Sequence, residues 1–126
     1  MLIKRGLDQP QPGTWATFGG KFEKGEDLDP KQNAIREFVE ESGYKGKFKI
    51  SSNPLDVYRT NHLQFYTFIG LFDEEFVPDL DTADEAIDYG WFYLGEFPEN
   101  LHIGVLDMFT ENKKTLENII CFYQDK

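Results

Sequence analysis

The sequence contains little cysteine and few basic residues, and both shortages limit what the protein can be. Its one cysteine, Cys121, excludes an intramolecular disulfide and any metal site built from several cysteines. Only 13 Lys and Arg residues stand against 23 Asp and Glu, which gives a formal net charge of -10 at pH 7. A chain this acidic repels polyphosphate backbones and anionic lipids at long range, which argues against non-specific nucleic-acid binding and membrane binding. It can hold a phosphate ligand only through a local basic group or a bridging metal cation.

Long apolar runs are also absent. No stretch approaches the roughly 18 residues of a membrane span, and the apolar part of the opening residues 1–5 is too short for a signal peptide. Because a lone cysteine fits a reducing compartment, we expect a cytoplasmic protein.

Apolar and aromatic residues, by contrast, are plentiful. In a chain of 126 residues they make up 40% and 16%, enough for one hydrophobic core, so we expect a single domain over residues 1–126. The hydrophobic pattern predicts a helix over residues 30–42, one or two helices from about 101 to 123, and strands at 2–4, 15–18, 45–50, 56–59, 63–72 and 90–94. Residues 63–72 are apolar on both alternating sets, which predicts a central strand covered on both faces. These elements predict an α/β (α+β) fold in which helices enclose a mixed β-sheet.

The helix over residues 30–42 carries the clearest local signals. Asp29 suits the N-cap, Pro30 suits the first helical position, and Gly43 suits the position after the end. At 100° per residue, one face gathers the side chains that we expect to be buried: Ala34, Ile35, Phe38, Val39 and Ser42.

The opposite face of this helix gathers Glu37, Glu40 and Glu41, with Arg36 beside them. Two carboxylates at roughly 6 Å repel by about 3 kcal/mol at an effective dielectric constant of 20. A divalent cation resolves this conflict, because carboxylate oxygens are the ligands that Mg²⁺ or Mn²⁺ prefers. A solvated acidic face is the alternative reading of the helix alone.

The neighbouring sequence bears on this choice. Gly20 is followed, after five residues, by Glu26, and residues 36–44 read R-E-F-V-E-E-S-G-Y. Upstream, residues 13–21 read G-T-W-A-T-F-G-G-K; downstream, Glu85 precedes Trp91, and residues 94–98 read L-G-E-F-P. Residues 20–44 thus resemble the signature of the Nudix hydrolases, the Nudix box, and the flanks resemble other segments of that family.

The resemblance implies a Nudix fold, an α/β/α sandwich around a mixed β-sheet, and a Mg²⁺-dependent hydrolase in which Mn²⁺ can substitute. Its substrates would be nucleoside diphosphate-X compounds, cleaved at a phosphoanhydride bond. By the same resemblance the metal ligands would be Gly19, Glu37, Glu40 and Glu41. Arg36 would orient Glu37, which is the general base or a ligand. Glu85 is the candidate for a second base outside the box, with Asp84 and Asp88 in reserve. Substrate contacts would come from Arg5, Gly20, Lys21 and Glu26.

Two departures from the family pattern affect these expectations. Nine residues separate Glu26 from Arg36, two more than the pattern has, which affects the placement of Glu26 more than that of the helix. The chain also begins late and omits the usual N-terminal strand. We therefore expect a sheet edge covered by the C-terminal helix or by a second copy of the chain, as in a homodimer.

The group X and the cleaved bond stay open. Five aromatic residues can stack on a base or pack in the core: Trp15, Tyr58, Phe65, Tyr66 and Trp91. Markers of the NADH, ADP-ribose and diadenosine-polyphosphate subfamilies are not evident, which favours a nucleoside triphosphate or a modified one. The alternatives are an ADP-ribose or dinucleotide polyphosphate hydrolase, a non-catalytic module that binds a nucleotide or sugar nucleotide, and an acidic protein that mimics nucleic acid.

Overall fold

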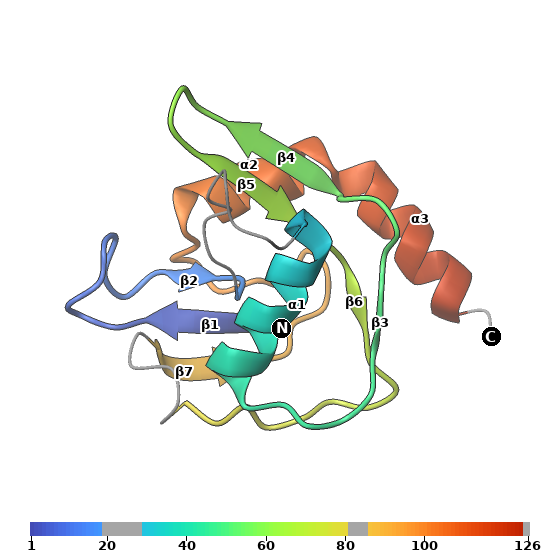
Figure 1. Cartoon of the computed structure of the whole chain (residues 1–126), viewed down its shortest axis with the longest axis horizontal. Helices are drawn as coiled ribbons and strands as arrows, with labels where there is room; N and C mark the ends of the chain where they lie inside the picture. The colour runs from blue at the N-terminus through green and yellow to red at the C-terminus, as the bar shows by residue number, and fades with distance from the viewer. Residues whose placement is uncertain (19–28, 81–85, 125–126) are drawn as a thin grey trace.

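The computed structural model describes residues 1–18, 29–80 and 86–124, which form a mixed α+β fold of three helices and short strands (Figure 1). The helices are α1 (Pro30–Ser42), α2 (Ile103–Glu111) and α3 (Lys113–Gln124). The strands are β1 (Leu2–Arg5), β2 (Trp15–Ala16), β3 (Lys49–Ile50), β4 (Asp56–Arg59), β5 (Gln64–Thr67), β6 (Gly70–Leu71) and β7 (Ala86–Gly90). Helix α1 lies in front of the strands in Figure 1, α2 passes behind the β4–β5 hairpin, and α3 extends away from the hairpin toward the C-terminus.

The chain's first strand lies in the middle of a three-stranded antiparallel sheet of order β2-β1-β7. Ile3 pairs with Ala16 on one side and with Tyr89 on the other. The outer edge of β2 is met by the segment before α2, because the Trp15 amide donates to Asn100 O and the His102 amide donates to Trp15 O, both at 2.8 Å. Residues 100–102 therefore occupy one edge of this sheet, while β1 is paired on both sides.

Residues 63–72 do not form the single central strand that the sequence predicts. They divide into β5, which pairs with β4, and β6, which pairs with β3. The Ser51 amide donates to Ile69 O and the Leu55 amide donates to Thr67 O, so residues 52–54 on one arm stand opposite Phe68 alone on the other. The extra residues include a proline, which has no amide hydrogen for a ladder. This mismatch separates one long hairpin into two short antiparallel sheets. Of the strand expected over residues 45–50, only Lys49 and Ile50 pair.

The last strand lies earlier than the sequence predicts, at 86–90 instead of 90–94. Its partner β1 fixes this register, in which Asp88 stands opposite Lys4. The strand ends where the Phe92 ring lies against Gly90, at a place where a Cβ atom would meet the ring at 2.5 Å. Asp88, one of the two reserve candidates for the second base, therefore lies in a strand.

Helix α1 has the ends that the sequence predicts. Asp29 Oδ1 accepts a hydrogen bond from the Gln32 amide at 2.7 Å, and Gly43 adopts the left-handed conformation with φ 67°. The predicted inner face is wrong at Val39, which is 40% exposed, and it omits Asn33, which is 3% exposed. The reason is that Phe38, rather than Val39, fills the space beneath α1. Its ring packs against an aromatic cluster of Phe18, Tyr44, Phe48, Phe72 and Phe76.

The hydrophobic core joins the first sheet to the C-terminal part of the chain. Its buried residues are Leu2, Ala16, Val105 and Met108. The region expected to hold one or two helices holds two, which meet at Asn112, whose side-chain amide donates to Met108 O at 2.9 Å. Val105 and Met108 of α2 face the core, whereas Leu106 between them is 48% exposed.

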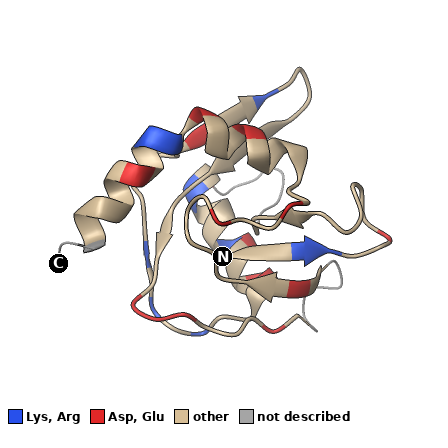
Figure 2. Ribbon diagram, turned by 180° about the vertical axis from the view of Figure 1, so that it is seen from behind, with Lys and Arg blue, Asp and Glu red and all other residues tan. Residues whose placement is uncertain are grey.

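Two observations concern the molecule's surface. Acidic residues are spread along α2, α3, β7 and the segment that precedes residue 81, whereas Lys and Arg are sparse (Figure 2). Within the part of the chain that the structure describes, none of the helices is both long and apolar enough to cross a membrane.

Candidate active site

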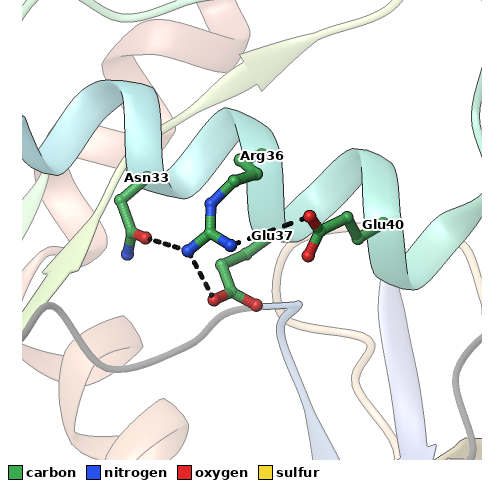
Figure 3. A network of polar contacts seen from close by, with 4 residues as sticks. All are labelled: Asn33, Arg36, Glu37 and Glu40. Atoms are coloured by element: carbon green, nitrogen blue, oxygen red, sulfur yellow. Dashed lines mark hydrogen bonds and ion pairs between the residues drawn. The ribbon is translucent and has the colours of Figure 1, made fainter. Parts of the chain in front are cut away.

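Four side chains on one stretch of α1 form a polar network (Figure 3). Arg36 Nη2 donates to Asn33 Oδ1 at 2.8 Å and lies 3.4 Å from Glu37 Oε1. Arg36 Nη1 lies 3.7 Å from Glu40 Oε1, an i,i+4 ion pair. One guanidinium thus contacts both carboxylates from the same side, as the helical spacing allows.

This arrangement changes the argument made from charge repulsion. From the sequence, a divalent cation was expected to offset the repulsion among the carboxylates. In the structure, Arg36 already offsets part of this repulsion. The side chains of Arg36, Glu37 and Glu40 are 40%, 22% and 59% exposed, so solvent screens both ion pairs. Exposed ion pairs contribute roughly 0 to 1 kcal/mol each to the free energy of unfolding. The crowding of Glu side chains therefore does not by itself require a metal, and the case for one has to rest on the chemistry of the donors.

The donor chemistry does fit a hard divalent cation. Carboxylates of Glu37, Glu40 and the half-buried Glu41 come from one helix and supply the oxygen ligands that such ions prefer. In the described ranges, however, no three acidic, His or Cys side chains converge closely enough to hold an ion. A complete ligand set would have to draw on further groups or on a rearrangement of these side chains.

Several of the predicted site residues lie outside the described residues: Gly19, Gly20, Lys21, Glu26, Asp84 and Glu85. Their expected roles stay predictions. Asp88, the other reserve base, is exposed in β7, and its Oδ1 accepts a hydrogen bond from the Tyr89 amide at 2.7 Å.

A cleft of about 820 Å³ opens beside α1. This volume lies within the range of small-molecule sites, roughly 300 to 1,000 Å³. Thr17 and Phe18 line it immediately before the box begins, and Asn33 lines it from α1. Four of the five aromatic residues proposed for base stacking also line it: Tyr58, Phe65, Tyr66 and Trp91. Trp15 does not, and packs instead against Phe92 at the core, with ring centroids 5.5 Å apart.

Arg5 and the nearby His102 line one corner of this cleft, and Arg5 makes this corner basic. Arg5, at the end of β1, donates from Nε to Pro10 O at 2.7 Å. His102 caps α2, since its Nδ1 accepts a hydrogen bond from the Gly104 amide at 3.0 Å. Burial, and then the nearby charge of Arg5, lower the pKa of His102 from its ordinary value of 6.5. The neutral ring that results accepts at Nδ1 and carries its proton on Nε2.

Sequence analysis gave no role to Asn33 or to His102, both of which line this cleft. For Asn33 a signal was present, because an amide three residues before an arginine on a helix lies within reach of it. For His102 none was available, since Arg5, whose charge acts on its ring, is distant in the sequence.

Comparison with known proteins agrees with this reading. Residues 1–112 match the NUDIX domain family. The chain matches no curated protein and no solved structure. Because the match covers most of the chain, the protein belongs to the Nudix family. A Nudix domain implies a pyrophosphohydrolase of nucleoside diphosphate-X compounds, and enzymes of the family generally use divalent cations.

Proposed function

We propose that this protein is a Mg²⁺-dependent Nudix pyrophosphohydrolase that acts on a nucleoside triphosphate or a modified nucleoside triphosphate. The observation that carries the proposal is the pairing of the α1 carboxylates with an adjacent cleft whose walls are aromatic and whose corner is basic. When bound, the cation would neutralise the diphosphate and acidify a water molecule.

The residues of α1 have distinct parts in this proposal. Glu40 and Glu41, with the carbonyl of Gly19, would hold the cation, and Glu37 would serve as a further ligand or as the general base. Glu37 is the less exposed of the two carboxylates that Arg36 contacts, which suits a group that has to be held in one orientation. Arg36 restrains it, and Glu85 stays the candidate for a second base.

The cleft would hold the nucleoside. Arg5, Gly20, Lys21 and Glu26 are the proposed substrate contacts, and Arg5 is the one that the structure describes, in the cleft wall. Its guanidinium offers a phosphate the local positive charge that a protein of net charge -10 otherwise has little of. Tyr58 and Phe65, whose ring centroids lie 6.2 Å apart, offer flat surfaces for a base.

The rest of the proposal concerns the whole chain. We infer one domain over residues 1–126, in which helices enclose the strands as an α/β/α sandwich around a mixed sheet. Among the described residues, parallel pairing occurs at the Trp15–Leu101 bridge. Cys121 is exposed and free, which suits a reducing, cytoplasmic location. A homodimer stays a prediction that size measurement in solution will test.

A substrate screen tests the function directly. Purified protein is incubated with dNTPs, oxidised dNTPs, ADP-ribose, dinucleotide polyphosphates and NADH, each with Mg²⁺, with Mn²⁺ and with excess EDTA. We expect release of phosphate or pyrophosphate from a nucleoside triphosphate that EDTA abolishes. Preferred cleavage of ADP-ribose or a dinucleotide would support the alternative substrates. Binding without turnover across the panel would support the non-catalytic module, and metal-independent binding to basic proteins would support nucleic-acid mimicry.

A further inference from the structure

We propose that Asn33 is a positioning residue of the active site, which holds the Arg36 guanidinium where it contacts Glu37 and Glu40. The inference rests on the proposed function, because it assumes that these carboxylates serve the reaction. It starts from one geometric fact: Arg36 Nη2 makes both the 2.8 Å hydrogen bond to Asn33 and the 3.4 Å contact to Glu37. The nitrogen that contacts Glu37 is therefore the one that Asn33 fixes.

The burial of Asn33 shows that its amide has a defined place. The residue is 3% exposed, and helical spacing places it on the same side of α1 as Glu37 and Glu40. A buried amide without a partner costs about 1 to 3 kcal/mol, so its hydrogen bond to Arg36 matters for the fold as well. Arg36 offers only donors, which requires that the amide oxygen face it. Figure 3 shows this orientation, with the amide nitrogen of Asn33 directed away from Arg36.

Arg36 needs such an anchor more than its carboxylate partners do. Its side chain is 40% exposed, and a long exposed side chain loses up to about 2 kcal/mol of rotamer entropy when it is held in one place. The contacts to Glu37 and Glu40, at 3.4 and 3.7 Å, are longer than the bond to Asn33. Of these three contacts of Arg36, the shortest is therefore the hydrogen bond to Asn33, which is the most buried of the three partners.

Asn33 also lines the cleft, so the same residue borders the proposed nucleoside site and contacts Arg36. A change at Asn33 should act on the reaction through Arg36. In other metal sites, loss of a residue that orients a ligand typically costs 10- to 100-fold in activity or metal affinity.

The experiment compares Asn33→Ala, Asn33→Asp, Arg36→Gln and the double variant Asn33→Ala/Arg36→Gln. The assay uses the nucleotide that the wild-type protein hydrolyses fastest with Mg²⁺. We expect Asn33→Ala to lower kcat by about 10- to 100-fold with KM changed less than about threefold. Asn33→Asp keeps an acceptor for Arg36 and should restore kcat to within about fivefold. In the Arg36→Gln background, Asn33→Ala should change kcat by less than about twofold.

Ser42→Ala is the matched control. Ser42 is the other buried polar residue of α1, 1% exposed, and its Oγ accepts a hydrogen bond from the Tyr44 amide at 3.1 Å. Its loss should lower the melting temperature without lowering kcat. Effects of Asn33→Ala and Arg36→Gln that multiply, or a Ser42→Ala variant as slow as Asn33→Ala, would show a merely structural role and overturn the inference.

A second measurement separates this inference from the proposed function. Mn²⁺ affinity, measured by titration without nucleotide, should fall about tenfold in Asn33→Ala and stay unchanged in Ser42→Ala. A wild-type protein that hydrolyses nothing in the screen contradicts the proposed function. Equal Mn²⁺ dissociation constants in wild type and Asn33→Ala contradict the positioning role, whatever the screen shows.

Discussion

Arg36 determines the charge balance along α1, because it lies within ion-pair distance of two of the helix's carboxylates. Its contacts show how an acidic helix face can persist in the absence of bound metal. They also mean that binding of a cation would compete with Arg36 for Glu37 and Glu40. The metal-free and metal-bound proteins should therefore differ in the Arg36 side chain more than in the backbone of α1.

Replacement of Glu40 separates catalysis from stability. Glu40→Gln should lower kcat by about 100-fold or more, because it removes a proposed metal ligand. Stability should change by less than about 1 kcal/mol, because the side chain is 59% exposed and its ion pair is screened. Steady-state kinetics and thermal unfolding measure the two effects.

Glu117→Gln is the control for this variant. Glu117 is also exposed, at 51%, and also forms an i,i+4 ion pair, with Lys113 on α3 at 4.0 Å. It should leave both kcat and stability unchanged. Full activity in Glu40→Gln, or a melting temperature lower by many degrees, would contradict the role given to Glu40.

The lowered pKa of His102 predicts that the protein loses stability in mild acid. Burial, and then Arg5, lower the pKa of His102 in the folded protein below its ordinary 6.5. Between the two pKa values the unfolded chain binds more protons, so the stability that this group contributes is complete above pH 6.5 and is lost as pH falls through the folded pKa. Protonation of Nδ1 also removes the acceptor for the Gly104 amide.

His102→Asn tests this prediction, because Asn is among the best N-cap residues and does not titrate. Urea unfolding at a series of pH values from 7.5 downwards should show a weaker pH dependence in this variant than in wild type. His62→Asn, a replacement in the exposed turn of the β4–β5 hairpin, should keep the wild-type dependence. An identical dependence in His102→Asn and wild type would show that other groups control the acid response.

The stability of helix α1 depends in part on the hydrogen bond at its N-terminal end. Asp29→Ala removes the acceptor that the Gln32 amide uses and should lower the free energy of unfolding by about 1 kcal/mol. Asp29→Asn keeps an oxygen in the same place and should cost only a few tenths of that value. Urea denaturation of the two variants provides the measurement, and equal stabilities for wild type and Asp29→Ala would contradict the capping role.

The contrast between α1 and the strands explains what sequence could predict. The bounds of α1 are correct because Asp29, Pro30 and Gly43 act locally, each within a few residues of the end that it defines. The prediction of one strand over residues 63–72 is wrong because this segment divides opposite an offset in its partner segment, near residues 52–54. The hydrophobic pattern does not reveal that offset. Strand pairing is a non-local choice, and propensity describes it poorly.

The candidate site likewise combines features that local sequence predicts with features that depend on contacts between distant segments. The carboxylates of α1 follow from helical spacing, and the family follows from a motif confined to residues 20–44. The basic corner could not be predicted, since Arg5 and His102 meet only after β1 and the start of α2 come together. Val39 was misplaced because helical period alone does not say how wide the buried face is when one large ring, Phe38, fills the space.

At the scale of the whole molecule, the core is small and concentrated where β1, β2 and α2 meet. Met108, at 6% exposed, should be among its most sensitive positions. Met108→Ala should lower the free energy of unfolding by about 2 to 5 kcal/mol, because it leaves a cavity. Ile103→Ala on the same helix, where Ile103 is 62% exposed, should change it by less than about 0.5 kcal/mol. Denaturant titration of both variants tests this placement of the core.

The position of residues 100–102 beside β2 has a consequence for how the protein is made. Strand β1 is synthesised before its neighbour β7 and before the segment that meets β2, both of which lie far later in the sequence. The outer edges of the β1–β2 pair must therefore stay unpaired until those segments have been synthesised. Pairing between distant segments is slow, and unpaired strand edges invite association with other chains. The nascent chain is thus exposed to misassembly until β7 and residues 100–102 have emerged to cover these edges.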